Sequence, residues 1–237
     1  MKLTARLTIL LALSLFVTSA VTDLSSKAAT RSESLDISPR IQESPVWCWV
    51  AVGQMVFEHY DIPNVNPNGD YQCGIVGALA GPSSPCFGNC RLCNVAGGTM
   101  NNIKAMIVTY PRDVQFLLHQ RVTQLSATVY DSPLSKGQVK TEIDAGRPIV
   151  TGVNFDAGNH PSQHVALIVG YDEDTEGNLI LTINDPFPYD LRPFNALPNP
   201  YVKAGGDDGR DGSFTIDYDK FRSGLRWREG IYQIRER

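Results

Sequence analysis

The segment that most constrains the fold is the apolar run VWCWVAVGQMVFEHY, which spans residues 46–60. Ser44 and Pro45 precede it, and they predict a helix start, because serine is a favoured N-cap and proline is favoured in the first turn. Trp47, Trp49 and the aliphatic residues that follow leave this helix almost no polar face. Such a helix has to be buried, so the rest of the chain must supply the layers that cover it.

Helix signals dominate the first half of the chain and strand signals the second. Further helices are predicted over residues 99–108 and 136–145, the latter with Ser135 as N-cap and Gly146 as its stop. Short runs rich in β-branched and aromatic residues predict strands over residues 149–155, 165–171, 178–183 and 230–234. This segregation predicts an α+β fold with a helical lobe and a sheet lobe.

The N-terminus has the pattern of a secretory signal over residues 1–20. It combines a basic start, an apolar run over residues 7–17 and small residues before position 21. The apolar run is shorter than the roughly 20 residues that a membrane helix needs, although an uncleaved anchor is the alternative. Residues 21–38 are polar and Ser-rich and are expected to be a linker or leader, which leaves residues 39–237 as the functional domain.

Composition restricts the partners of the chain. Hydrophobic residues are 42% and charged residues 19%, a balance typical of globular domains that fold without oligomerisation, so a monomer is expected. The formal net charge is −4 and basic residues form no cluster, which argues against nucleic-acid binding. No second membrane span is predicted after signal cleavage, so the mature protein is expected to be secreted or periplasmic.

The five cysteines divide into four and one. Residues 61–72 and 81–99 are expected to be loops, and four cysteines crowd into or beside them, whereas Cys48 stands apart in the apolar run. In an oxidising compartment paired cysteines become disulfides and the odd one remains a free thiol. A four-thiolate zinc site is the alternative, and the pairing is left open. The four are Cys73, Cys86, Cys90 and Cys93.

Cys48 is expected in the first turn of the buried helix. Unpaired backbone N–H groups and the helix dipole favour negative charge there, so they stabilise a thiolate, which is the form of cysteine that attacks carbonyl carbons. Gln42 lies shortly before Cys48, and its side-chain amide can stabilise a developing oxyanion together with the backbone N–H of the cysteine. The alternatives are an inert buried cysteine and a surface glutamine.

Two residues of the second half fit the same chemistry. His164 opens the strand run HVALIVGY, where it can serve as general base for the thiol, and His160 in the preceding loop is its rival. Asp185 follows the next predicted strand and can accept the second ring N–H of His164, although the adjacent Asn184 could orient the ring instead. Taken singly, each has an ordinary structural role, such as a turn started by Asp185.

Together these segments resemble the papain-like cysteine peptidases. The shared elements are Q-x5-C-W at the buried helix, G-R-P-I-V, H-V-A-L-I-V-G-Y and I-N-D-P, spread over residues 41–234. The likeness is closer to the compact bacterial members of peptidase families C39 and C70 than to papain. It implies a two-lobed fold, a helical lobe with a buried catalytic helix packed on an antiparallel sheet lobe. It also implies Cys48 as nucleophile, His164 as base and acid, Asp185 as third member and Gln42 in the oxyanion hole.

The chain departs from papain in two places. The nucleophile stands in V-W-C-W-V rather than C-G-S-C-W, and the cysteine-rich segment over residues 73–93 has no recognised counterpart. The stretch over residues 205–212 resembles a fragment of a calcium loop, but no glutamate follows at the required position, so a solvated turn is expected.

The sequence therefore predicts peptide-bond hydrolysis through a thioester at Cys48, with a protein or peptide as substrate and with no cofactor or metal. Other thiol acyl-transfer enzymes remain alternatives, namely a transglutaminase, a deamidase or a cell-wall amidase, because they use the same Cys–His pair. An inactive binding module and a zinc- or disulfide-stabilised interaction protein are the non-enzyme alternatives.

Overall fold

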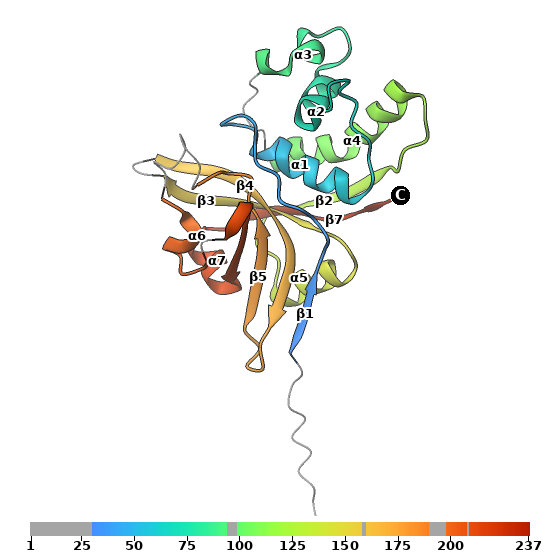
Figure 1. Ribbon diagram of the computed structural model, residues 1–237. Coiled ribbons are helices and arrows are strands. Elements are labelled where there is room, and N and C mark those ends of the chain that lie inside the picture. The colour runs from blue at the N-terminus through green and yellow to red at the C-terminus, as the bar shows by residue number, and fades with distance from the viewer. Residues whose placement is uncertain (1–29, 94–98, 158–159, 190–197, 208) are drawn as a thin grey trace, which may run out of the picture.

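The computed structural model describes residues 30–93, 99–157, 160–189, 198–207 and 209–237 (Figure 1). The predicted signal over residues 1–20 and the first part of the segment over residues 21–38 lie outside the described residues. Within these ranges no helix has both the length and the apolar character needed to cross a membrane.

One antiparallel sheet organises the described part of the chain. Its strands are β1 (Arg31–Ser34), β2 (Leu125–Tyr130), β3 (Ile149–Ala157), β4 (His160–Glu173), β5 (Leu179–Asn184), β6 (Ser213–Asp217) and β7 (Glu229–Glu236). The order across the sheet is β2-β7-β3-β4-β5-β6. β1 pairs with the part of β4 that lies beyond the first residue of β3. β4 is the central strand, because it pairs with β1, β3 and β5.

Helices cover both faces of this sheet. The group drawn above the sheet in Figure 1 comprises α1 (Cys48–His59), α2 (Tyr71–Ala80), α3 (Pro85–Gly88), the 3-10 turn η1 (Cys90–Leu92) and α4 (Met100–Leu118). The other face carries α5 (Lys136–Asp144), α6 (Pro200–Lys203) and α7 (Tyr218–Gly224), and the short η2 (Arg210–Gly212) leads into β6. The molecule thus has a helical lobe packed on a sheet lobe.

Alternation along β4 divides the core into two apolar clusters. Val165 and Leu167 pack into the cluster shared with α1, α2 and α4, whereas Ala166 and Ile168 pack into the cluster shared with α5 and α7. Successive side chains of a strand point to opposite faces, so one strand can serve both clusters. α1 is buried along most of its length, as its apolar composition predicts.

The predicted α+β class, with a helical lobe on an antiparallel sheet, is confirmed. The four predicted strands are present as β3, β4, β5 and β7, although β4 begins earlier than expected, at His160. The helix over residues 136–145 is present as α5, where Ser135 and Gln138 form a reciprocal capping box. The helix from residue 99 is present as α4 but continues to Leu118, through Pro111.

Several local predictions were wrong or incomplete. The first helix begins at Cys48 rather than at Ser44 and Pro45, because the N–H groups of Val50 and Ala51 reach the carbonyl of Trp47 and the residues before it form a turn. The region over residues 81–99, expected to be a loop, contains α3 and η1, two short turns next to the disulfide-bonded cysteines. α2 was also missed, since its two internal glycines weaken a helical pattern.

The described end of the expected linker over residues 21–38 lies in the sheet. β3 begins opposite Ile168, so the backbone of β4 beyond that point has no partner from β3, and Arg31–Ser34 pairs with it instead. The N–H of Leu35 then donates to the carbonyl of Val169 at 2.8 Å. Unpaired backbone groups at a sheet edge favour such pairing, which the polar composition of this segment did not reveal.

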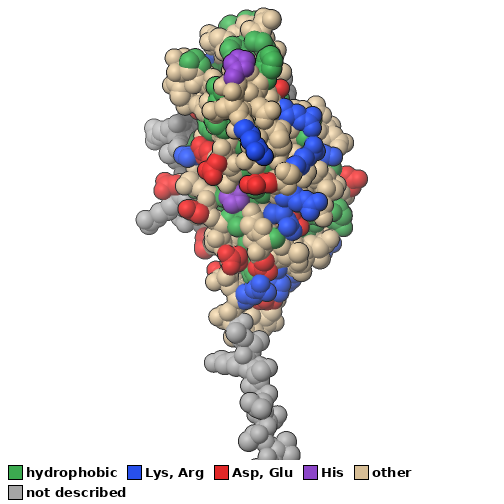
Figure 2. Space-filling view, turned by 90° about the vertical axis from the view of Figure 1, so that its right-hand side faces the viewer, with side chains coloured by type: hydrophobic (Ala, Val, Ile, Leu, Met, Phe, Trp, Pro, Cys, Tyr) green, Lys and Arg blue, Asp and Glu red, His purple; other side chains and the backbone are tan. Residues whose placement is uncertain are grey.

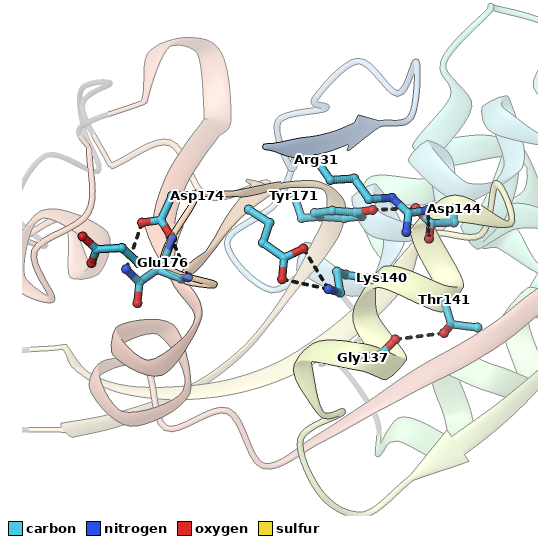
Figure 3. A network of polar contacts seen from close by, with 10 residues as sticks. Arg31, Gly137, Lys140, Thr141, Asp144, Tyr171, Asp174 and Glu176 are labelled. Atoms are coloured by element: carbon cyan, nitrogen blue, oxygen red, sulfur yellow. Dashed lines mark hydrogen bonds and ion pairs between the residues drawn. The ribbon is translucent and has the colours of Figure 1, made fainter. Parts of the chain in front are cut away.

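Ion pairs and hydrogen bonds fasten β1 to α5 and β4 (Figure 3). Nη2 of Arg31 lies 2.6 Å from Oδ2 of Asp144, and the hydroxyl of Tyr171 donates to Oδ1 of the same carboxylate at 2.6 Å. Lys140 reaches both oxygens of Glu173 at 2.8 and 2.9 Å. Arg31 thus joins β1 to α5, and the contacts of Tyr171 and Glu173 join α5 to β4.

On the face shown in Figure 2, Lys and Arg side chains lie among Asp and Glu side chains rather than in a continuous basic stripe. Mixed charge of this kind gives little attraction for a polyanion, and the expectation that nucleic acid is not a partner stays a prediction.

Candidate active site

The predicted nucleophile and histidine meet where the first turn of α1 packs against β4. Cys48 is the first residue of α1, and His164 lies in β4 with 7% of its surface exposed. A hydrogen bond joins the thiol and the imidazole, and the backbone N–H of Val165 also donates to the sulfur. A helix start and a central strand therefore bring together two residues that are far apart in the sequence.

Asp185 completes the arrangement from the end of β5. β4 and β5 are antiparallel with Leu167 opposite Asn184, so the residue after β5 arrives beside His164. Nε2 of His164 lies 2.6 Å from Oδ1 of Asp185, whose side chain has no exposed surface. This contact leaves Nδ1 as the ring nitrogen for Cys48.

The pKa of the Cys48 thiol is lowered and the pKa of the His164 imidazole is raised, so both shifts favour the charged form of the group. Burial raises the pKa of the Cys48 thiol, but the hydrogen bond and charge of His164 and the N–H of Val165 outweigh it, so the pKa lies below the ordinary 9.0. Burial lowers the pKa of His164, but the charge and hydrogen bond of Asp185 and the contact with Cys48 raise it from 6.5 to about 10. Both shifts favour a thiolate–imidazolium pair.

The carboxylate of Asp185 is compensated by several donors besides the histidine. The N–H of Phe187 donates to Oδ1 at 2.8 Å, and the hydroxyls of Tyr201 and Tyr189 donate to Oδ2 at 2.8 and 3.3 Å. Burial and the nearby carboxylate raise the pKa of both tyrosines well above 10, so they remain protonated donors. The sequence pattern did not indicate either tyrosine.

Asn184 points away from the histidine. Its Nδ2 donates to the carbonyl of Ile37 at 2.7 Å, and it is 1% exposed. Neighbouring residues at a strand end face opposite sides, so of the two only Asp185 contacts the ring of His164. Asn184 instead fixes the chain that leads from β1 toward Gln42.

Gln42 lies in the buried stretch just before α1. Its backbone N–H donates to the carbonyl of Pro186 at 2.9 Å, which ties it to the residue after Asp185. Its Nε2 donates to the carbonyl of Ser44 at 2.8 Å, and its side chain is 7% exposed. The structure thus places Gln42 between the start of α1 and the Asp185 turn.

Gln72 on α2 holds the backbone on both sides of Gln42. Its Nε2 donates to the carbonyl of Ile41 at 2.8 Å, and its Oε1 accepts from the N–H of Glu43 at 3.0 Å. Nε2 also lies 3.1 Å from Oε1 of Gln54 on α1, and Gln72 is 2% exposed. No sequence signal pointed to this residue, which falls in a stretch expected to be a loop.

The segment over residues 205–212 also reaches the site. The N–H of Asp185 donates to the carbonyl of Gly212 at 2.8 Å, and Gly212 has a φ of +87°. A Cβ there would lie 2.9 Å from the carbonyl oxygen of Asp185, so only glycine fits. The expectation of a solvated turn missed this contact.

The other histidines lie elsewhere. His59 is the last residue of α1, about 16 Å from Cys48 at 1.5 Å per residue, and contacts the carbonyl of Gly146 at 2.8 Å. His119 ends α4. His160 stands in β4 rather than in the predicted loop, four positions before His164 and so about 13 Å away along the strand.

The four clustered cysteines form two disulfides. Cys73 pairs with Cys90 and Cys86 with Cys93, while Cys48 is free. This agrees with the predicted division into four and one and selects one of the three pairings. With all four sulfurs in disulfides, a four-thiolate zinc site does not form here.

The sequence profile of the Peptidase_C39 like family matches residues 34–205. The chain belongs to this family. The match covers Gln42, Cys48, His164 and Asp185, and it confirms the resemblance to papain-like cysteine peptidases of the C39 type.

Other comparisons are more distant. No curated protein matches the sequence significantly. A crystal structure of a candidate C39-like peptidase from Bacillus anthracis aligns with 87% of this chain and 100% of its own, at 14% identity and a TM-score of 0.38.

The geometry predicts the reactivity of the thiol. In the native, non-reduced protein, iodoacetamide should alkylate Cys48 alone, and should do so below pH 7, because the thiolate is stabilised. In the His164→Ala variant burial would dominate, so the pH profile of alkylation should move above pH 9. Peptide mapping and rate measurements over pH check both outcomes. Labelling at the four disulfide cysteines, or an unchanged profile in the variant, would contradict the arrangement.

Proposed function

We propose that this member of the Peptidase_C39 like family is an exported cysteine peptidase that cleaves protein or peptide substrates. The observation that carries the proposal is the contact of Cys48 with His164, whose other ring nitrogen lies 2.6 Å from a fully buried Asp185. A helix-start thiol, a histidine and an orienting carboxylate are the parts that thiol acyl transfer requires.

The first half of the reaction forms a thioester. The thiolate of Cys48 attacks the scissile carbonyl carbon, and the carbonyl electron pair moves onto oxygen. The imidazolium of His164 then donates its Nδ1 proton to the departing amine as the C–N bond breaks. Asp185 keeps the ring in place and stabilises its positive charge before this transfer.

The second half hydrolyses the thioester. Neutral His164 removes a proton from water, the hydroxide attacks the acyl carbon, and the C–S bond breaks to release a carboxylic acid and the thiolate. Both tetrahedral intermediates carry an oxyanion, for which the N–H of Cys48 and the amide of Gln42 are the proposed donors. An amide group has two donor hydrogens, so the bond of Gln42 to Ser44 leaves one for the oxyanion.

Related thiol reactions are the second candidate. A transglutaminase, a deamidase or a cell-wall amidase would use the same Cys–His–Asp set. These enzymes differ in which amide the thiolate attacks and in which nucleophile then accepts the acyl group. Membership in a family of peptidases favours peptide hydrolysis. An inactive binding module is disfavoured because Gln42, Cys48, His164 and Asp185 are all present together.

Export is part of the proposal. Its support is the signal pattern over residues 1–20 together with two disulfides, which persist in oxidising compartments. The mature enzyme is proposed to act in the periplasm or outside the cell as a monomer.

Casein digestion separates the two histidines. His164→Ala should abolish cleavage of casein, whereas His160→Ala should retain most of it, since His160 is about 13 Å away along β4. Both variants are melted to exclude unfolding as the cause. Full cleavage by His164→Ala would show that His164 is not the general base. No cleavage by the native protein, alongside normal Cys48 alkylation, would favour a transferase or amidase.

The charge of Asp185 can be tested by replacement with asparagine. Asp185→Asn keeps the size of the side chain but removes the charge that raises the pKa of His164, so kcat should fall by roughly 10-fold or more with little change in KM. The alkaline limb of the pH–rate profile should also move below pH 10. The control Asn184→Ala should lower the melting temperature but preserve the profile. A larger loss of kcat in Asn184→Ala than in Asp185→Asn would show that Asn184, and not Asp185, orients His164.

A further inference from the structure

A cavity of about 490 Å³ lies in the helical lobe. α2 lines one side with Val76, Leu79 and Ala80, and Trp49 of α1 lines another. Trp49 directly follows Cys48 in the first turn of α1, so the wall of the cavity begins one residue from the reactive thiol.

The disulfide-bonded segment lines another side of the cavity. Both cysteines of the Cys86–Cys93 disulfide line it, together with Leu92 of η1. Leu79 and Leu92, which line it, are 38% and 68% exposed. Exposed apolar side chains gathered around a concavity mark a binding site for an apolar group.

Residues next to those that line the cavity interact with the chain around Gln42. Gln72 of α2 bonds to the backbone on both sides of Gln42. The charge of Arg91, which precedes Leu92, acts on the carboxylate of Glu43, the residue after Gln42. α2 and η1, which both contribute to the cavity wall, thus also interact with the chain on either side of Gln42, and α1, which contributes Trp49, begins at Cys48.

We propose that this cavity is a specificity pocket that binds an aliphatic or aromatic side chain of the peptide substrate near the scissile bond. The inference rests on the proposed peptidase function. The side chains that line the cavity carry no charge, so an acidic or basic substrate side chain would lose its hydration without a compensating partner. The disulfide-bonded segment would then set substrate choice while the Cys–His–Asp set performs the chemistry.

The test compares cleavage sites in casein by mass spectrometry. The native protein should favour Leu, Ile, Phe, Val or Met at one fixed position relative to the cleaved bond. Leu92→Glu places a charge at the rim and Ala80→Trp fills the cavity, and both positions are exposed enough to accept the change. Each should lose the preference and cleave an apolar-site peptide ~10-fold to ~100-fold less efficiently. The matched control Phe116→Glu, an exposed apolar residue of α4, should keep both.

Two further measurements separate failure of the pocket from failure of the peptidase. Alkylation of Cys48 should be unchanged in Leu92→Glu and Ala80→Trp. Binding of a leucine-containing peptide and of its aspartate counterpart is also measured on the non-catalytic Cys48→Ala protein. Preference for the leucine peptide, lost in Leu92→Glu, supports the pocket even if the native protein does not hydrolyse casein. An equal preference in native protein and pocket variants, in cleavage and in binding, overturns it.

A separate observation assigns a role to Gln72. Its two bonds to Ile41 and Glu43 fix the backbone on either side of Gln42, and it is itself 2% exposed. We infer that Gln72 is a positioning residue that aims the amide of Gln42 at the oxyanion. A donor misplaced by a fraction of an ångström loses much of its effect on the transition state.

A double-mutant cycle tests this role. Gln42→Ala should lower kcat ~100-fold and Gln72→Met ~10-fold, both with little change in KM and unchanged Cys48 alkylation. The double variant should be no worse than Gln42→Ala, because Gln72 acts through Gln42. Gln54→Met, which removes only the third bond of Gln72, should be mild. Additive losses would show a purely structural Gln72, and a harmless Gln42→Ala would instead overturn the proposed oxyanion donor.

Discussion

The site is organised around one buried negative charge, the carboxylate of Asp185. A carboxylate without solvent contact is tolerated only when donors and a positive charge surround it. The donors come from separate parts of the chain: His164 in β4, Phe187 and Tyr189 in the segment after β5, and Tyr201 in α6. Compensating this charge therefore fixes the geometry of the sheet end where the histidine stands.

The same turn positions the other half of the site. The backbone N–H of Asp185 is held by Gly212, and the carbonyl of Pro186 accepts from the N–H of Gln42. Gln42 is then joined to α2 through Gln72 and is followed by the start of α1 at Cys48. One chain of hydrogen bonds thus runs from the orienting carboxylate to the residue proposed to stabilise the oxyanion. Within this arrangement the pKa of His164 is raised and the pKa of the neighbouring Cys48 thiol is lowered, although burial opposes both shifts.

The sequence predicted those parts of the site that have a recognisable local pattern. The apolar helix, the four strand runs and the isolated Cys48 each have a pattern readable within a few residues, and these predicted the fold class and the meeting of Cys48, His164 and Asp185. The register of β4 and β5 then decided between Asp185 and Asn184, which sequence alone left open. Gln72, Tyr201 and Gly212 could not be foreseen, because their roles depend on contacts between segments distant in sequence. β1 was missed for the same reason, since its pairing depends on where β3 begins.

The central claim is that His164 is an imidazolium paired with a thiolate and held by Asp185. The most direct measurement is a pH titration of the histidine ring nitrogens by NMR, with the His164 signals assigned by their loss in His164→Ala. The account predicts that the His164 ring stays doubly protonated through neutral pH and loses its proton only near pH 10. A ring that titrates near its ordinary pKa of 6.5, with no change on alkylation of Cys48, would contradict it.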